Sequence, residues 1–264
     1  MYLSATLTQA LTWGLALLSS LPPAYASPVV LHVKRAPSIP GPPADPTAPA
    51  SGDGAGPYNS EDPSWTDRAQ MLTFRSMAVA ASGLGLGNAA GNLEHYLDNT
   101  GADRTNSPDD MMEEMPSFRE AVQALATEHA SQAFGAVVAT GRGGSKTFVS
   151  PWTGFYATKA KSTDWFFALG GFSFAVAGEV AVRQESGGKW TGEVSYKVYV
   201  FDRYNWDSGK SVTIGPFTFE DTELGRMHLV GLAREYIVRG SSKVQTVEDY
   251  TGGTVRMPDT GGGR

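Results

Sequence analysis

The sequence predicts an α+β fold, with N-terminal helices packed on an antiparallel, partly barrel-like sheet and one late helix. Two patterns predict this class. Apolar side chains recur at helical spacing between residues 64 and 129, whereas from Phe134 onward β-branched and aromatic residues alternate with polar ones. Because the helices precede the strands instead of alternating with them, a parallel α/β arrangement is not expected.

Residues 1–26 are predicted to be a secretory signal peptide. Their apolar run, Ala10 to Leu18, is followed by a Pro pair and by Ala24-Tyr25-Ala26, whose small residues a signal peptidase selects. The run is shorter than the ~20 residues that cross a bilayer. The alternative is a buried N-terminal helix. We expect a secreted, extracellular protein that does not span a membrane.

Residues 27–63 are predicted to be a pro-region and a Pro/Gly-rich linker. The pair Lys34-Arg35 is similar to the dibasic sites that kexin-type proteases cut in fungal secretory pathways, although surface Lys-Arg pairs are also common. After this pair, Pro, Gly, Ala and Ser dominate. Such a segment buries too little surface to offset its ordering entropy, so we expect an extended tether and not a site.

Charge and composition exclude several classes of function. A formal net charge of −6 argues against nucleic acid as a partner. The chain has no cysteine, which excludes thiol catalysis and thiolate metal sites and requires an ordinary hydrophobic core in place of disulfides. No spacing of His, Asp and Glu resembles a metal-binding motif, so a structural metal is not expected.

A single α+β domain is predicted over residues 64–250. Its first helix begins after the N-cap residue Ser64 and ends in the glycine-rich run 82–87. A shorter helix is expected within residues 88–101, and a third opens at Pro116. The late helix is expected to follow Asp221 as its cap.

The second half of the domain is predicted to be mainly strand. The alternation of Val194, Tyr196 and Val198 with polar residues indicates a sheet with one solvated face. Residues 251–264 are expected to form a flexible tail. The expected strands lie in residues 134–150, as two short strands joined by a Gly-rich hairpin, and in residues 165–184, 190–204, 211–219 and 236–247.

Two glycine-rich runs have a spacing that partly fits nucleotide binding. The run that begins at Gly83 carries part of a dinucleotide fingerprint, but that motif requires a preceding strand and a helix is expected there. The run that begins at Gly141 has the wrong spacing for a phosphate loop and is followed by a strand. We interpret the first as a helix end and the second as a hairpin tip.

The stretch DRYNWD, residues 202–207, is the candidate functional site. It places two carboxylates, an amide, a guanidinium and two aromatic rings at one strand end. The alternative is a turn whose polar groups only cap the loop and pair with one another. The candidate catalytic residues are Asp202, Tyr204, Asp207 and His228, and the candidate binding residues are Arg203, Asn205 and Trp206.

Three blocks of sequence carry a resemblance to a known family. The runs DWFFALGGFSFAV, VYVFDRYNWDSGKSVTIGPFTFED and MHLVGLAREYIVRGSS resemble a largely uncharacterised, toxin-like C-terminal domain of secreted proteins from actinobacteria and fungi. The likeness covers residues 93–242. It implies export and a toxin-like role but supplies no activity.

A looser similarity is to the colicin M-type bacteriocins, which cleave lipid II with a divalent cation. Asp202, Tyr204 and His228 match their Asp-x-Tyr-Asp and His-Arg motif, whereas Asn205 and Leu229 replace its second Asp and its Arg. These replacements remove charge that such hydrolysis needs. Mg²⁺ is implied as a cofactor only in this alternative.

The leading hypothesis is therefore a secreted effector or toxin-like protein that acts outside the producing cell through the DRYNWD stretch. Its partner would be a target-cell protein or a lipid-linked component of the cell envelope. One alternative is metal-assisted phosphodiester hydrolysis of a lipid-linked cell-wall precursor. The other is a non-enzymatic structural protein of the cell surface.

Overall fold

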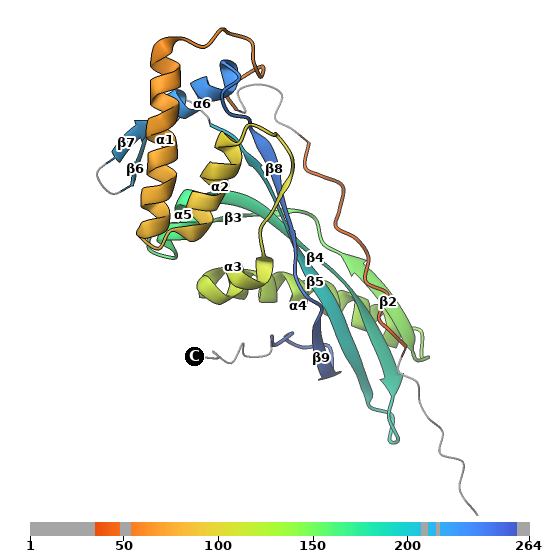
Figure 1. Cartoon of the computed structure of the whole chain (residues 1–264). Helices are drawn as coiled ribbons and strands as arrows, with labels where there is room; N and C mark the ends of the chain where they lie inside the picture. Colours follow the sequence, from red (N-terminus) through yellow and green to blue (C-terminus); the bar gives the residue numbers. More distant parts are fainter. Residues whose placement is uncertain (1–34, 48–53, 207–210, 215–216, 258–264) are drawn as a thin grey trace, which may run out of the picture. The chain divides into compact units, whose positions relative to one another are not determined.

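The computed structural model describes residues 35–47, 54–206, 211–214 and 217–257 (Figure 1). From Pro37 onward the chain belongs to one compact unit. The predicted signal peptide, Lys34 of the dibasic pair, the candidate residue Asp207 and the end of the predicted tail lie outside the described residues, so these predictions stay predictions.

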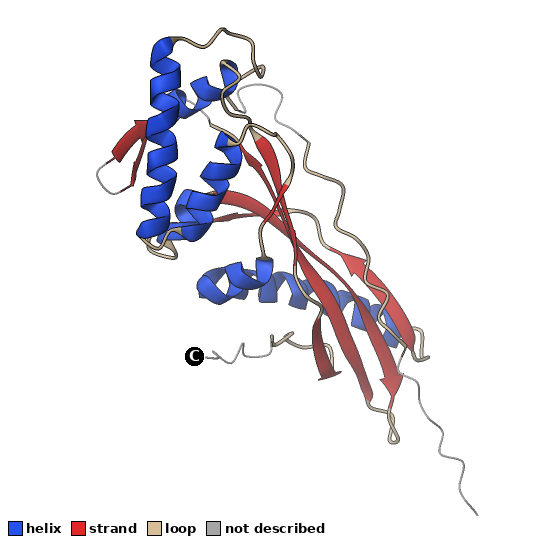
Figure 2. Cartoon of the chain, viewed as in Figure 1, coloured by secondary structure: helices blue, strands red, loops and turns tan. Residues whose placement is uncertain are grey.

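Helices and strands both contribute to the domain, as an α+β fold requires (Figure 2). The helices are α1 (Trp65–Gly83), α2 (Gly87–Leu97), α3 (Pro108–Glu114), α4 (Pro116–Val138), α5 (Thr163–Ala168) and α6 (Asp221–Leu229). The strands are β1 (Arg104–Thr105), β2 (Gly144–Val149), β3 (Thr153–Tyr156), β4 (Gly171–Gln184), β5 (Trp190–Tyr204), β6 (Ser211–Ile214), β7 (Phe217–Glu220), β8 (Tyr236–Ser241) and β9 (Gln245–Tyr250).

The main sheet has the strand order β1-β8-β5-β4-β2, with β3 also paired to β4 and β9 also paired to β5. All these pairs are antiparallel except β1 with β8, which is parallel. The sheet does not close on itself, so the expected, partly barrel-like sheet is an open one. The α+β class is confirmed, and the parallel β1–β8 pair makes the sheet mixed.

The centre of the sheet is the long hairpin of β4 and β5. Its strands pair from Ser173 opposite Phe201 to Gln184 opposite Trp190. The turn between them contains Gly187, whose φ of 107° is accessible to glycine at little cost. Because β5 is much longer than its neighbours, it pairs with β8 near one end and with β9 near the other, and the candidate stretch begins where β5 meets β8.

One face of this hairpin packs against α4. The buried residues of α4 recur at helical spacing, among them Phe118, Val122 and Ala126, and Val194 and Val198 of β5 belong to the same apolar cluster. The predicted alternation along β5 is confirmed, since the residues between these positions point to the opposite face. A second apolar cluster joins α1, α2 and α6 to the end of β5.

The first two helices end where the sequence predicts. Ser64 caps α1 in a capping box. Its hydroxyl accepts from the Asp67 amide, and the Asp67 carboxylate accepts from the Ser64 amide. Gly85, with a φ of 80°, follows the end of α1, and Asn99, with a φ of 62°, follows the end of α2. The late helix is also confirmed, but its N-cap is Glu220 instead of Asp221.

Other boundaries differ from the prediction. Residues 134–138 continue α4 instead of forming a strand, because Phe134 and Val137 complete the buried face of that helix. The short helices α3 and α5 were not predicted, although Ser107 and Ser162 cap them. Each helix is only one or two turns long, which is too short for a periodic pattern to emerge.

The predicted tether does not lie free of the domain throughout. Residues 37–47, which we call the strap, have no regular secondary structure but run along the sheet on the side opposite α4 (Figure 1). The Ser38 amide donates to Oε2 of the buried Glu179 at 2.7 Å, and the Tyr199 hydroxyl donates to the Pro40 carbonyl at 3.0 Å. The strap therefore covers part of the sheet face that the sequence predicts to be solvated.

Candidate functional site

A pocket of about 480 Å³ opens at the end of β5. Its size falls within the range of roughly 300–1,000 Å³ that is usual for ligand sites. Five structural groups form it: α1 and α2, α6 with β6, the end of β3, the segment from α5 into β4, and the candidate stretch itself. The candidate residues that line it are Asp202, Arg203, Tyr204, Asn205 and Trp206.

The pairing of β5 with β8 positions these residues. Asp202 lies opposite Val238 and Tyr204 lies opposite Tyr236, so both are fixed in a sheet and not carried by a free loop. Asn205 and Trp206 follow directly, and the Trp206 amide donates to Oε1 of Glu235 at 3.2 Å. The chain therefore leaves the sheet in a defined direction at the pocket.

Tyr204 forms part of the aromatic wall of the pocket. Its ring stacks on Tyr236 with centroids 4.8 Å apart and meets Trp206 edge-on at 5.5 Å. The residue is buried, and burial is the main cause that raises the pKa of its hydroxyl well above the usual range, with the charge of Asp202 adding to the effect. Such a phenol stays protonated near neutral pH, so Tyr204 can donate a hydrogen bond there but does not act as a base.

The charged groups that line the pocket are two carboxylates and one guanidinium. Asp202 from β5 and Asp221 from the first turn of α6 both line it. Arg203 also lines the pocket, and its Nη2 donates to the carbonyl of Pro46 in the strap at 2.7 Å. Lys159 lies beside one wall of the pocket, with Nζ 4.9 Å from the ring centroid of the lining residue Phe167.

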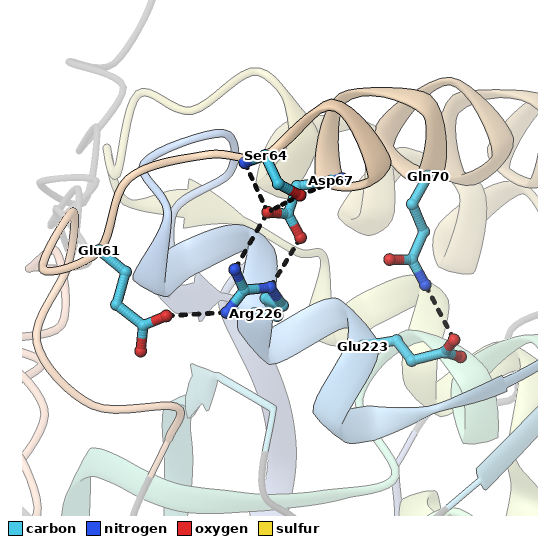
Figure 3. Close-up of polar contacts among 6 residues, drawn as sticks. All are labelled: Glu61, Ser64, Asp67, Gln70, Glu223 and Arg226. Atoms are coloured by element: carbon cyan, nitrogen blue, oxygen red, sulfur yellow. Dashed lines mark hydrogen bonds and ion pairs between the residues drawn. The ribbon is translucent and has the colours of Figure 1, made fainter.

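An ion pair between α1 and α6 fixes the wall that α6 contributes (Figure 3). Arg226 donates to both carboxylate oxygens of Asp67, at 2.6 and 3.0 Å, and to Glu61 at 2.8 Å. Gln70 donates to Glu223 one turn further along, at 2.8 Å. These contacts hold α6 against α1, so that Asp221 and Leu224 reach the pocket from a rigid helix.

His228 does not meet the other candidate catalytic residues. It is buried and is not among the residues that line the pocket. Its Nδ1 accepts from the Glu235 amide at 3.0 Å, which leaves Nε2 as the donor to the Gly56 carbonyl at 3.1 Å. The imidazole therefore joins the segment before α1 to the segment after α6 and is not placed to act as a base beside Asp202.

Part of the pocket could not be predicted from the candidate stretch. Tyr156, Phe166 and Phe167 form a second aromatic wall, which the pairing of β3 with β4 brings opposite β5. The adjacent pair Phe166-Phe167 was the one available signal, and we interpreted it as strand. Among the described residues, no three His, Asp or Glu side chains gather closely enough to hold a metal ion.

No family model matches the chain, and no curated protein matches it. Both resemblances drawn from the sequence therefore stay predictions. Within the described part of the chain, none of the helices combines the length and apolar character that crossing a bilayer requires.

Proposed function

We propose that this protein is secreted and acts outside the producing cell by binding a target-cell protein through the pocket at the end of β5. The observation that carries the proposal is the pocket itself. It joins two aromatic walls to two carboxylates, and five of the residues that the sequence singled out line it. Aromatic side chains held on a rigid frame are typical anchors of binding sites.

Binding is favoured over hydrolysis by the positions of the candidate catalytic groups. The hydrolase alternative requires Asp202, Tyr204 and His228 to converge on one cleft. His228 is occupied by Gly56 and Glu235, and the Tyr204 phenol is kept neutral by burial. The residues that remain can recognise a ligand but do not form a pair of acid and base.

The chemistry of the lining selects the kind of ligand. Apolar and aromatic side chains, among them Leu93, Phe167 and Trp206, form most of the enclosure, and the two carboxylates of Asp202 and Asp221 outnumber the one guanidinium of Arg203. An apolar or aromatic side chain next to a positively charged group complements this lining. A pyrophosphate-linked lipid would bring its anionic head group to the carboxylates, so a protein is the better match of the two expected partners.

Small aromatic probes of similar size but different charge test this preference. We expect phenethylammonium to bind the full chain more tightly than 2-phenylethanol, and 3-phenylpropanoate to bind least, as measured by saturation-transfer NMR. Asp202→Asn should reduce the difference between the ammonium and the alcohol because it removes one carboxylate. Equal binding of all three probes, or tightest binding of the carboxylate, would overturn the proposed ligand chemistry.

An aromatic substitution with a matched control tests the location. Tyr156 is 55% exposed and lines the pocket, whereas Tyr58 is 37% exposed and does not line it. Tyr156→Ala should weaken probe binding and any effect on target cells, and Tyr58→Ala should leave both unchanged while circular dichroism stays native. If the two variants behave alike, the site lies elsewhere.

A further inference from the structure

Helix α1 carries a second apolar face that the fold of one chain does not use. Trp65, Leu72 and Val79 are 89%, 67% and 68% exposed. The residues spaced between and after them on the same face, Ala69, Ser76 and Gly83, are also exposed and are small. We call these six residues the α1 stripe.

The α1 stripe lies directly opposite the buried face of the helix. Its members are separated alternately by four and three residues, which confines them to roughly 80° of the helix circumference at 100° per residue. The opposite face of α1 packs into the core through Phe74, Met77, Ala78 and Ala81. Packing within the described part of the chain therefore does not account for the apolar side chains of the stripe.

Spacing by fours and threes is the pattern by which one helix packs along another. Scattered exposed apolar residues need no explanation, but large apolar residues aligned along one exposed helix face mark an interaction surface. We propose that the α1 stripe is a homodimer interface, in which α1 of one chain packs antiparallel against α1 of a second copy.

The order of side chains along the stripe is what selects a second copy as the partner. In an antiparallel pair centred near position 74, Trp65 faces Gly83 and Leu72 faces Ser76 of the other chain. Ala69 then faces Val79, so every large residue meets a small one. At Gly83 a Cβ would meet no atom of its own chain within 4 Å, which leaves room for the incoming indole. A parallel pair would instead place Trp65 on Trp65 and leave gaps at the small residues.

The charge of Arg75 beside the stripe is compatible with this pairing. Near the centre, the guanidinium of Arg75 donates to the Leu97 carbonyl at 2.9 Å and lies 3.7 Å from Asp98. Each chain therefore brings a counter-charge for its own arginine. Repulsion between the two copies at this position is reduced accordingly.

The size of the interface sets the strength of association. A helix of 19 residues is about 28 Å long, and one helix pair buries less than the roughly 1,200 Å² of a standard stable interface. We expect a concentration-dependent dimer with a dissociation constant in the micromolar range. The isologous contact closes after two copies and does not propagate into a fibre.

Sedimentation velocity of the full chain, from low micromolar to submillimolar concentration, tests the dimer. We expect reversible monomer–dimer exchange in the wild type and about tenfold or greater weakening in Leu72→Lys, which buries a charge at the contact. Leu72 is exposed in the monomer, so the variant should keep its circular dichroism and melting temperature. Thr66→Lys, on α1 but off the stripe, is the matched control and should dimerise as the wild type does.

Cross-linking tests the orientation, because the natural chain has no cysteine. A mixture of Leu72→Cys and Ser76→Cys chains should form the mixed disulfide faster than either chain cross-links with itself. Fastest cross-linking of Leu72→Cys alone would indicate a parallel pair and would overturn the antiparallel arrangement. A wild-type chain that stays monomeric throughout would overturn the dimer, and neither result bears on ligand binding in the pocket.

Discussion

Arg226 and Asp67 join α6 to α1 through two parallel hydrogen bonds, from Nε to Oδ1 at 2.6 Å and from Nη2 to Oδ2 at 3.0 Å. The Asp67 side chain is only 4% exposed, whereas that of Arg226 is 39% exposed. The pair therefore combines a buried acceptor with a donor that keeps contact with solvent. This geometry is stronger than an exposed ion pair and avoids the full desolvation cost of a buried one.

Loss of this carboxylate should destabilise the protein. We expect Asp67→Asn to lower the free energy of unfolding by about 2 kcal/mol, since charged hydrogen bonds to Arg226 and the α1 cap are weakened together. Urea unfolding measures the change. Asp98→Asn is the control, because the Arg75–Asp98 pair spans 3.7 Å with both side chains at least half exposed, and we expect its effect to stay below about 0.5 kcal/mol.

The contribution of Asp67 should depend on pH. The hydrogen bond from Arg226 is the main cause that lowers the pKa of Asp67 from 3.8 to about 2 in the folded protein. Because the unfolded chain binds the proton more readily, the stabilisation is complete above about pH 3.8 and is lost as the pH falls through about 2. The stability difference between wild type and Asp67→Asn should shrink over that interval, and a difference that persists unchanged at pH 2 would contradict this account.

The strap should open locally when its ion pair is removed. Arg239 donates to both oxygens of Asp45, at 2.6 and 2.8 Å, and to Asp103 at 2.7 Å. Arg239→Gln should raise hydrogen exchange of the amide of Ser38 while exchange in β4 stays slow, because local opening does not require unfolding of the sheet. Arg183→Gln, which removes an exposed arginine away from the strap, should leave that exchange unchanged; equal effects would mean that the ion pair does not hold the strap.

A close approach of β4 to β5 leaves no room for a side chain at position 178, so replacing Gly178 should destabilise the protein. A Cβ there would lie 2.5 Å from the Ser195 carbonyl oxygen and 2.6 Å from Cζ of Phe148. We expect Gly178→Ala to cost about 1–3 kcal/mol by overpacking. Gly135 in α4 meets nothing within 4 Å, so Gly135→Ala should raise the stability by about 0.5–1 kcal/mol. Thermal unfolding of both variants checks the pair, and a neutral Gly178→Ala would show that the strands can separate.

Local signals predicted the fold best where the cause of the structure is local. The cap at Ser64 and the alternation along β5 depend on neighbours in sequence, and both were recognised. Helix α4 extends beyond its predicted end, through Val137, because its last residues pack against the sheet. The strap binds side chains such as Tyr199, which are far away in the sequence. Composition alone cannot reveal that a Pro-rich segment finds such partners.

Only the part of the candidate site that depends on neighbours in sequence was predicted. The stretch 202–206 was singled out because polar and aromatic residues gather there, and it does line a pocket. Its opposite wall comes from residues 156–171, which only the pairing of β3 with β4 brings near. The burial of Tyr204 and the two partners of His228 are likewise tertiary, so their residue types suggested chemistry that their surroundings do not support.

His228 should prove structural when it is replaced. Both ring nitrogens are hydrogen-bonded, and the neighbouring carbonyl of His228 accepts from the Asn59 amide at 3.0 Å, so the residue fastens the segment before α1 to α6. His228→Ala should lower the free energy of unfolding by about 2–3 kcal/mol because buried polar groups lose their partners. Urea unfolding measures this loss, and hydrogen exchange around Asn59 should rise with it. Binding of phenethylammonium should stay within about twofold of wild type, since the imidazole does not line the pocket. A variant that keeps its stability but loses the probe would place His228 in the site after all and would restore the catalytic alternative.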